Sequence, residues 1–192
     1  MQVLADPEQA PSGLQMPAAP HRAAHPLART ASPGEYLSFC LGAESYGLAL
    51  SCIQEIRSYQ APTRIANAPE EVCGVLNLRG TIVPVVDLRL RFQVGTGVNA
   101  MTAIVVVNVR EQAVGLVVDS VADVTPLASD EIKPAPALGG RACTDHIIGI
   151  ACVRRDDVER MLILLDIEQL VLDASVPSDV VDIACSAAGV AS

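Results

Sequence analysis

Few residues in this chain could do covalent chemistry, and the most enzyme-like group is the tetrapeptide CTDH, from Cys143 to His146. A thiolate beside an imidazole can act as a nucleophile, but the two side chains must meet in space. Neighbouring loop residues usually point apart, so we do not expect a Cys143–His146 dyad. The acidic pair Asp156–Asp157 lies in a polar turn, where both carboxylates are most simply solvated. A cysteine-dependent enzyme is kept only as an alternative.

Metal binding is the second chemistry to consider, because His21 and His25 have the i, i+4 spacing of a helical ligand pair. Pro26 and the proline- and alanine-rich surroundings argue against a helix there. The six cysteines show no CxxC spacing, and most lie in apolar runs, where cysteine behaves as a small hydrophobe. Phosphate-binding loops and a GxSxG elbow are also missing. We therefore expect no catalytic residue, no metal site and no cofactor, which points to a binding module.

The charge balance narrows the class of partner. A formal net charge of −9 disfavours nucleic acid, whose binding depends largely on Lys and Arg at phosphates, so a small-barrel nucleic-acid binder is a weak alternative. No apolar run approaches the roughly 18 residues of a membrane span. The N-terminus lacks the basic and apolar regions of a signal peptide. We expect a cytoplasmic protein with no direct membrane insertion.

The elements that must position any functional group are mainly β-strands, since the chain is rich in valine and poor in aromatic residues. Short helices are predicted at 88–92 and 167–171. The domain is predicted at 35–171, between a disordered Pro/Ala-rich arm (1–34) and a flexible C-terminal tail (172–192). Four hairpins are predicted, with strands at 36–41 and 46–50, 75–78 and 82–86, 103–109 and 113–118, and 147–153 and 161–165.

Two pairs of segments indicate that the core repeats itself. YGLALSCIQEI (46–56) aligns with VGLVVDSVADV (114–124), and IVPVVDL (82–88) aligns with MLILLDI (161–167). Because both matches occur in the same order, we predict two similar β subdomains side by side, each a closed or nearly closed barrel. The aligned pairs include Gly47/Gly115, Glu55/Asp123, Gly74/Gly149 and Asp87/Asp166.

The stretch NLRGTIVPVVDL (77–88) is the most informative hairpin. Gly80 can take the positive φ that a tight two-residue turn requires, and Asn77 could cap that turn. Pro84 cannot donate to a strand ladder, so it belongs at an edge, a bulge or an unpaired position. The oppositely charged Arg79 and Glu55 could pair, and at an interface such a pair orients partners.

The run GVLNLRGTIVPVVDLR (74–89) resembles the hallmark of the CheW family of chemotaxis coupling proteins. The resemblance covers roughly residues 35–171, in order. Four further segments share it: YGLALSCIQEIRSY (46–59), TRIANAPEEVCGV (63–75), VGLVVDSVADV (114–124) and RMLILLDIEQLV (160–171).

This resemblance implies a mainly β fold with two five-stranded SH3-like barrel subdomains, short helices and a shared hydrophobic core. It also implies a non-enzymatic adaptor that couples transmembrane chemoreceptors to the histidine kinase CheA. The expected partners are the methyl-accepting chemoreceptor's cytoplasmic tip, bound between the barrels, and the regulatory domain of CheA, in receptor arrays at the membrane. A coupling protein of a type IV pilus or another chemosensory-like pathway is the alternative with the same fold.

The resemblance also directs attention to particular residues. Glu55 and Arg79 match a glutamate and an arginine important for partner binding in the family, and Gly74 and Asn77 match positions in the same region. Apolar side chains could line a groove for a helical partner, with segment 117–123 as the opposite wall. The full set expected to bind receptor or kinase is Ile53, Glu55, Ile56, Gly74, Val75, Asn77, Arg79 and Val117.

Overall fold

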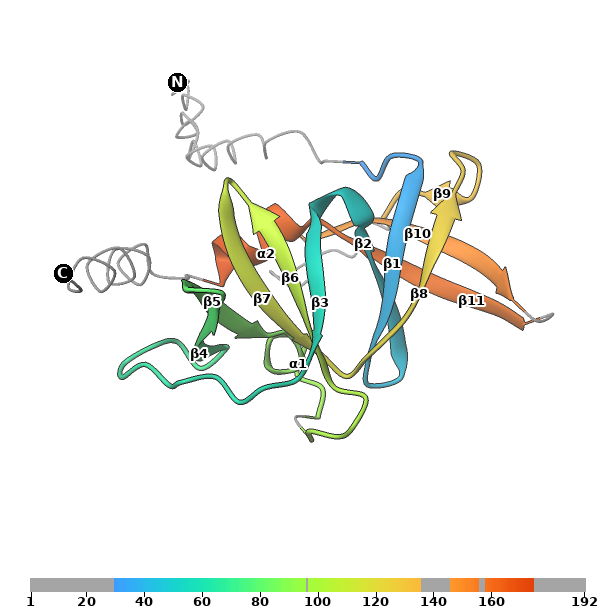
Figure 1. Ribbon diagram of the computed structural model, residues 1–192. Coiled ribbons are helices and arrows are strands. Elements are labelled where there is room, and N and C mark those ends of the chain that lie inside the picture. The colour runs from blue at the N-terminus through green and yellow to red at the C-terminus, as the bar shows by residue number, and fades with distance from the viewer. Residues whose placement is uncertain (1–29, 96, 136–145, 156–157, 175–192) are drawn as a thin grey trace, which may run out of the picture.

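The computed structural model describes residues 30–95, 97–135, 146–155 and 158–174, and β-strands are its main secondary structure (Figure 1). Two short α-helices, α1 (Leu88–Arg91) and α2 (Ile167–Asp173), follow strands, and a 3-10 turn, η1, covers Leu50–Cys52. The strands are β1 (Gly34–Leu41), β2 (Glu44–Ala49), β3 (Ile53–Ser58), β4 (Val72–Leu78), β5 (Thr81–Asp87), β6 (Ala103–Val109), β7 (Gln112–Val118), β8 (Ser120–Leu127), β9 (Ile132–Lys133), β10 (Ile147–Arg155) and β11 (Val158–Leu165).

The strands form two sheets. One has six strands in the order β8-β1-β2-β11-β10-β9, and the other has five in the order β3-β6-β7-β5-β4. The four predicted hairpins are confirmed as β1–β2, β4–β5, β6–β7 and β10–β11. Both predicted helices are present too. Among the described residues none belongs to a helix long and apolar enough to cross a membrane.

The chain crosses from one sheet to the other twice. β3 follows β2 in sequence but pairs with β6 in the five-stranded sheet, and β8 follows β7 but pairs with β1 in the six-stranded sheet. The repeated segments 46–56 and 114–124 each cover this crossing, β2 to β3 and β7 to β8. The two parallel pairings are also equivalent, because Val85 lies opposite Gly115 and Leu164 opposite Gly47. The internal repeat is therefore a structural repeat.

Local details follow the same repeat. Asp87 and Asp166 each cap a helix, the first accepting from the Arg89 amide and the second from the Glu168 and Gln169 amides. Gly74 and Gly149 each sit at a register shift in a hairpin. A further segment crosses beside each glycine: Thr63 bridges to Val75, and Lys133 of β9 pairs with Ile150.

Three hydrophobic clusters hold the fold together. The largest lies between the sheets and contains Phe39 and Leu41 of β1, Val105 and Val107 of β6, and the helix α2 residue Leu170, all buried. Two smaller clusters lie one inside each sheet, around Leu162 and Leu164 in one and around Val85 and Val106 in the other. This agrees with the expected shared core between two subdomains. We refer to the largest cluster as the shared core.

The strand pairing of the described residues does not close either sheet into a barrel, so the expected five-stranded barrels are curled, open sheets, and one of them gains a sixth strand, β9. The buried core extends from Ala31, whose amide donates a hydrogen bond to the Ile148 carbonyl at 3.2 Å, to Ala174, whose side chain is buried. Segments 1–29 and 175–192 lie outside the described residues, so their expected disorder stays a prediction.

Candidate protein-interaction surface

The hairpin between β4 and β5 ends in the two-residue turn Arg79–Gly80. Leu78 pairs with Thr81, and both turn residues have positive φ, +54° for Arg79 and +92° for Gly80. These values define a type I′ turn, the kind that matches the twist of a β-hairpin. Asn77 stabilises it, since its Oδ1 accepts a hydrogen bond from the Gly80 amide at 2.8 Å. The predicted tight turn and its Asn77 cap are both present.

Arg79 occupies a backbone conformation that an arginine adopts at a cost. A left-handed residue with a Cβ costs about 1–2 kcal/mol, and asparagine tolerates it better than most residues. The β6–β7 hairpin has the same geometry, with Arg110 at φ +50° and Glu111 at +67°. Arg79 points its side chain outward, 84% exposed. The turn thus places an exposed guanidinium at the tip of the hairpin.

Arg79 reaches across to Glu55 on β3. Its Nη2 donates to Glu55 Oε2 at 3.3 Å, although β3 and β4 are the two outermost strands of the five-stranded sheet. Four strand spacings would separate these edges by about 19 Å in a flat sheet. The contact therefore shows that this sheet curls until its edges approach each other, with charged side chains in place of backbone hydrogen bonds.

Glu55 has a second cationic neighbour. Arg57 Nη1 lies 3.6 Å from Glu55 Oε1, so each carboxylate oxygen faces a different arginine. Glu55 and Arg57 are two residues apart on β3 and therefore share a face of the strand. The Glu55 side chain is 29% exposed and that of Arg57 33%. We call Glu55, Arg57 and Arg79 the charged seam; sequence reasoning missed Arg57, although its i+2 spacing from Glu55 was visible.

The apolar residues predicted to line a groove lie on β3 and β4, the two edge strands of the five-stranded sheet. Ile53 packs against the shared core, and Ile56, opposite Val105 in the pairing with β6, is 45% exposed. Val75 lies on β4, at the other edge of the same sheet, and the curl of the sheet brings these two edges together. A groove shared by Val75 and the β3 residues stays a prediction. Val121 and Val124 of β8 pack against the same shared core as Ile53, and Val121 belongs to the segment 117–123 expected as the opposite wall.

Two other predicted site residues have structural positions. Val117 is fully buried in the cluster inside the five-stranded sheet, so it offers no surface to a partner, and its place in the predicted set is corrected. Gly74 is also buried, with φ +138°. A Cβ at this position would lie 2.0 Å from the Thr63 carbonyl oxygen, so glycine allows the 63–64 segment to cross β4 closely.

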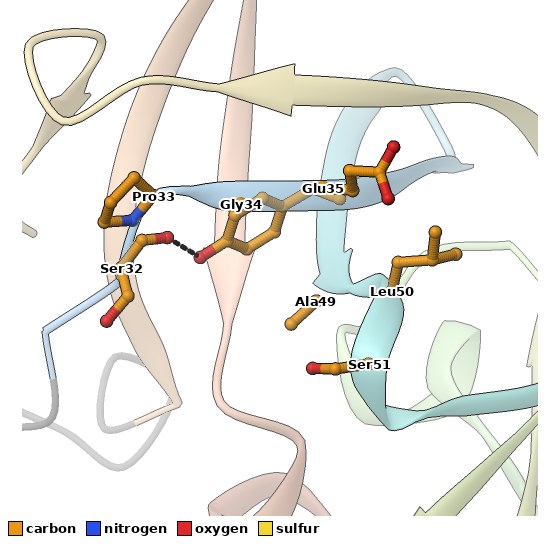
Figure 2. Close-up of a pocket in the computed structure, with 8 residues that line it drawn as sticks. Ser32, Pro33, Gly34, Glu35, Ala49, Leu50 and Ser51 are labelled. Atoms are coloured by element: carbon orange, nitrogen blue, oxygen red, sulfur yellow. Dashed lines mark hydrogen bonds between the residues drawn. The ribbon is translucent and has the colours of Figure 1, made fainter.

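One cavity of the described surface lies apart from the predicted binding residues. A cavity of about 500 Å³ lies where β1 begins and β2 ends. Figure 2 shows its lining, which includes Pro33, Glu35 and Leu50. The Tyr36 hydroxyl there donates to the Ser32 carbonyl at 2.7 Å, and burial raises the pKa of the phenol. None of the predicted binding residues lines this cavity.

A buried ion pair lies deeper in the five-stranded half. Arg89, 2% exposed, donates through Nε and Nη2 to both oxygens of Asp87 at 2.9 and 2.7 Å, and through Nη1 to the Gly97 carbonyl at 2.8 Å. These hydrogen bonds to Asp87 raise the pKa of Arg89. Every donor group of the guanidinium thus has a protein acceptor, and the pair anchors helix α1 to β5.

The alternative of a cysteine enzyme gains no support from the described residues. Cys143 lies outside them, and His146 is buried with its Nε2 3.2 Å from Arg91 Nη2. Burial raises the pKa of the Cys73 thiol, which makes it a poor nucleophile. The His21–His25 pair is likewise outside the described residues, within which no group of three His, Cys, Asp or Glu could hold a metal ion.

Known proteins of one family resemble this chain in sequence. The CheW-like domain family matches residues 35–175. A "Chemotaxis protein CheW" from Klebsiella aerogenes is 45% identical over 137 residues, which cover 71% of this chain and 80% of the relative. A "Probable chemotaxis protein CheW" from Rhizobium etli is 29% identical over 137 residues, 71% and 86% of the two chains.

A solved structure shares the fold. The scaffolding protein TtCheW from Thermoanaerobacter tengcongensis superimposes with a TM-score of 0.64 and 34% sequence identity, covering 72% of this chain and 92% of that one. The family match spans both sheets, the charged seam and the helix α2. This chain belongs to the CheW-like domain family.

Proposed function

We propose that this chain is a non-enzymatic scaffold that couples transmembrane chemoreceptors to the histidine kinase CheA in chemotaxis signal transduction. The observation that carries the proposal is the strained, exposed Arg79, which pairs with Glu55 at the junction of two sheet edges. Family membership and relatives named for chemotaxis support it.

The charged seam is the proposed contact to the kinase. An exposed ion pair contributes only about 0–1 kcal/mol to folding, so stability does not explain the cost of placing an arginine at the turn. At an interface the same charges select the partner and fix its orientation. Arg79 and Asn77 are both exposed on the hairpin, and the regulatory domain of CheA is the proposed partner.

The proposed contact to the receptor lies on the other face of β3. Ile56 is an exposed apolar side chain beside the shared core, and Ile53 and Val121 continue the apolar surface towards β8. An apolar strip with polar neighbours suits one face of a helix. The helical hairpin at a chemoreceptor's cytoplasmic tip is the proposed occupant, which would recruit the chain from the cytoplasm to membrane-bound receptor arrays.

A reconstitution of all three components tests the proposal. The full chain is combined with CheA and receptor-containing membranes from the same bacterium, and kinase autophosphorylation is measured. We expect receptor control of the kinase to require this chain. Arg79→Glu should weaken CheA binding, and Ile56→Asp should weaken receptor binding. The matched control is Arg110→Glu, in the equivalent turn of the β6–β7 hairpin.

The folded state of each variant is checked by circular dichroism and thermal melting. Loss of the fold on Arg79→Glu would contradict a role in binding alone. Failure of the unmodified chain to bind either partner would refute the coupling function.

A further inference from the structure

We infer that Arg57 is a positioning residue of the charged seam: it stays with the Glu55 carboxylate when a partner takes Arg79. The inference rests on the proposed function and adds to it a residue outside the predicted site. It starts from the observation that one carboxylate serves two guanidinium groups, each on a different oxygen, at 3.6 Å for Arg57 and 3.3 Å for Arg79.

The two arginines differ in how tightly they are placed. Arg57 lies within β3, where its backbone position is set by pairing opposite Ile104 of β6, and its side chain is two-thirds covered. Arg79 is at the tip of a hairpin, with 84% of its side chain exposed. Arg79 is therefore the group that a partner can reach and turn, whereas Arg57 remains beside Glu55.

The need for a second cation follows from burial. Glu55 is already only 29% exposed in the free chain, and a partner placed over Arg79 would cover it further. A carboxylate that loses its counter-ion while it loses water carries the full cost of desolvation. With Arg57 in place, Glu55 keeps a counter-ion, so Arg79 can turn to the partner without leaving an unpaired charge behind.

The charge count of the charged seam fits this role. Two cations and one anion leave one positive charge in excess, in a chain whose formal net charge is −9. If Arg79 were the sole counter-ion of Glu55, a partner would have to compete with the Glu55 carboxylate for the Arg79 guanidinium. Because Arg57 also pairs with Glu55, that competition is removed.

The test is a double-mutant cycle measured by binding of the full chain to the regulatory domain of the cognate CheA. Arg57→Met removes the charge and keeps an apolar stem of similar length, and Glu55→Gln removes the carboxylate. We expect Arg57→Met to weaken binding about tenfold, equivalent to about 1.4 kcal/mol. In the Glu55→Gln background the same change should have less than about twofold effect, because no carboxylate then needs a counter-ion.

Two controls distinguish positioning from a general effect. Arg57→Lys keeps the positive charge and should retain most of the affinity, and Arg110→Met removes an arginine from the other type I′ turn and should leave affinity unchanged. Equal weakening by Arg57→Met in both backgrounds would overturn the inference, because it would mean that Arg57 contacts the partner directly. Absence of binding by the unmodified chain would instead refute the proposed function.

Discussion

Replacing Arg79 by asparagine separates partner binding from folding more sharply than any charge reversal. Asn-Gly is the preferred pair for a type I′ turn, and Arg79 with Gly80 already has this geometry, with φ values of +54° and +92°. Arg79→Asn should therefore relieve backbone strain while it removes the guanidinium. We expect a variant that is more stable and yet binds CheA less tightly.

The size of the effect follows from two opposing terms. Relief of left-handed strain should stabilise the fold by about 1 kcal/mol. Loss of the contact to Glu55, on a side chain 84% exposed, should cost a few tenths of a kcal/mol. The net gain is about 0.5 kcal/mol, which raises Tm by about 1–2 °C in a chain of this size. Arg110→Asn has no ion pair to lose among the described residues and should gain the whole amount.

Urea unfolding of both variants measures the stability terms, and titration against the regulatory domain of CheA measures binding. We expect Arg79→Asn to weaken binding about tenfold or more, as truncation of an interface arginine commonly does. Arg110→Asn should leave binding unchanged. The reasoning is refuted if Arg79→Asn destabilises the fold by more than about 1 kcal/mol, which would make Arg79 a structural residue. Unchanged affinity would equally remove Arg79 from the interface.

Three further predictions concern the scaffold behind the charged seam. Gly74→Ala should cost more than about 3 kcal/mol in urea unfolding, because φ is +138° and the new Cβ would lie 2.0 Å from the Thr63 carbonyl oxygen. Arg89→Met should lower the free energy of unfolding by about 3–5 kcal/mol, because it leaves the Asp87 carboxylate buried without its cation. Asp87→Asn in the same chain should restore part of that stability. A double variant no more stable than Arg89→Met would contradict the ion-pair argument. Burial raises the pKa of the Cys73 thiol above its ordinary 9.0, so the thiol's contribution to stability is complete below pH 9.0 and is lost as pH rises through the raised value. Cys73→Val should reduce this loss of stability at alkaline pH. An unchanged dependence of unfolding free energy on pH would contradict the role of Cys73.

Much of the fold could be predicted because its signals are local. Alternating apolar residues gave the four hairpins, and the positive-φ requirement at Gly80 gave the tight turn with Asn77 as its cap. The two short helices were predicted where each follows a strand, and the aspartates that precede them proved to be their caps. Each of these depends on contacts within a few residues of chain.

The site was predicted less completely because its parts are distant in sequence. Glu55 and Arg79 were expected to pair, and they do, but their meeting depends on a sheet that curls until β3 approaches β4. Val117 has the residue type of a groove wall, and only packing placed it in the core.

Propensity, periodicity and turn chemistry act over short stretches of chain, so the eight strands of the four hairpins, the tight Arg79–Gly80 turn and the internal repeat could be read from the sequence. The strands β3, β8 and β9 were not predicted. The tertiary structure decided that the chain crosses between the sheets before β3 and again before β8, because a strand pattern specifies a buried face but not the strand that pairs with it. The first crossing places Glu55 and Arg57 in the same sheet as β4, within reach of Arg79. The charged seam is thus a product of long-range pairing between segments that, taken separately, are ordinary β-strands.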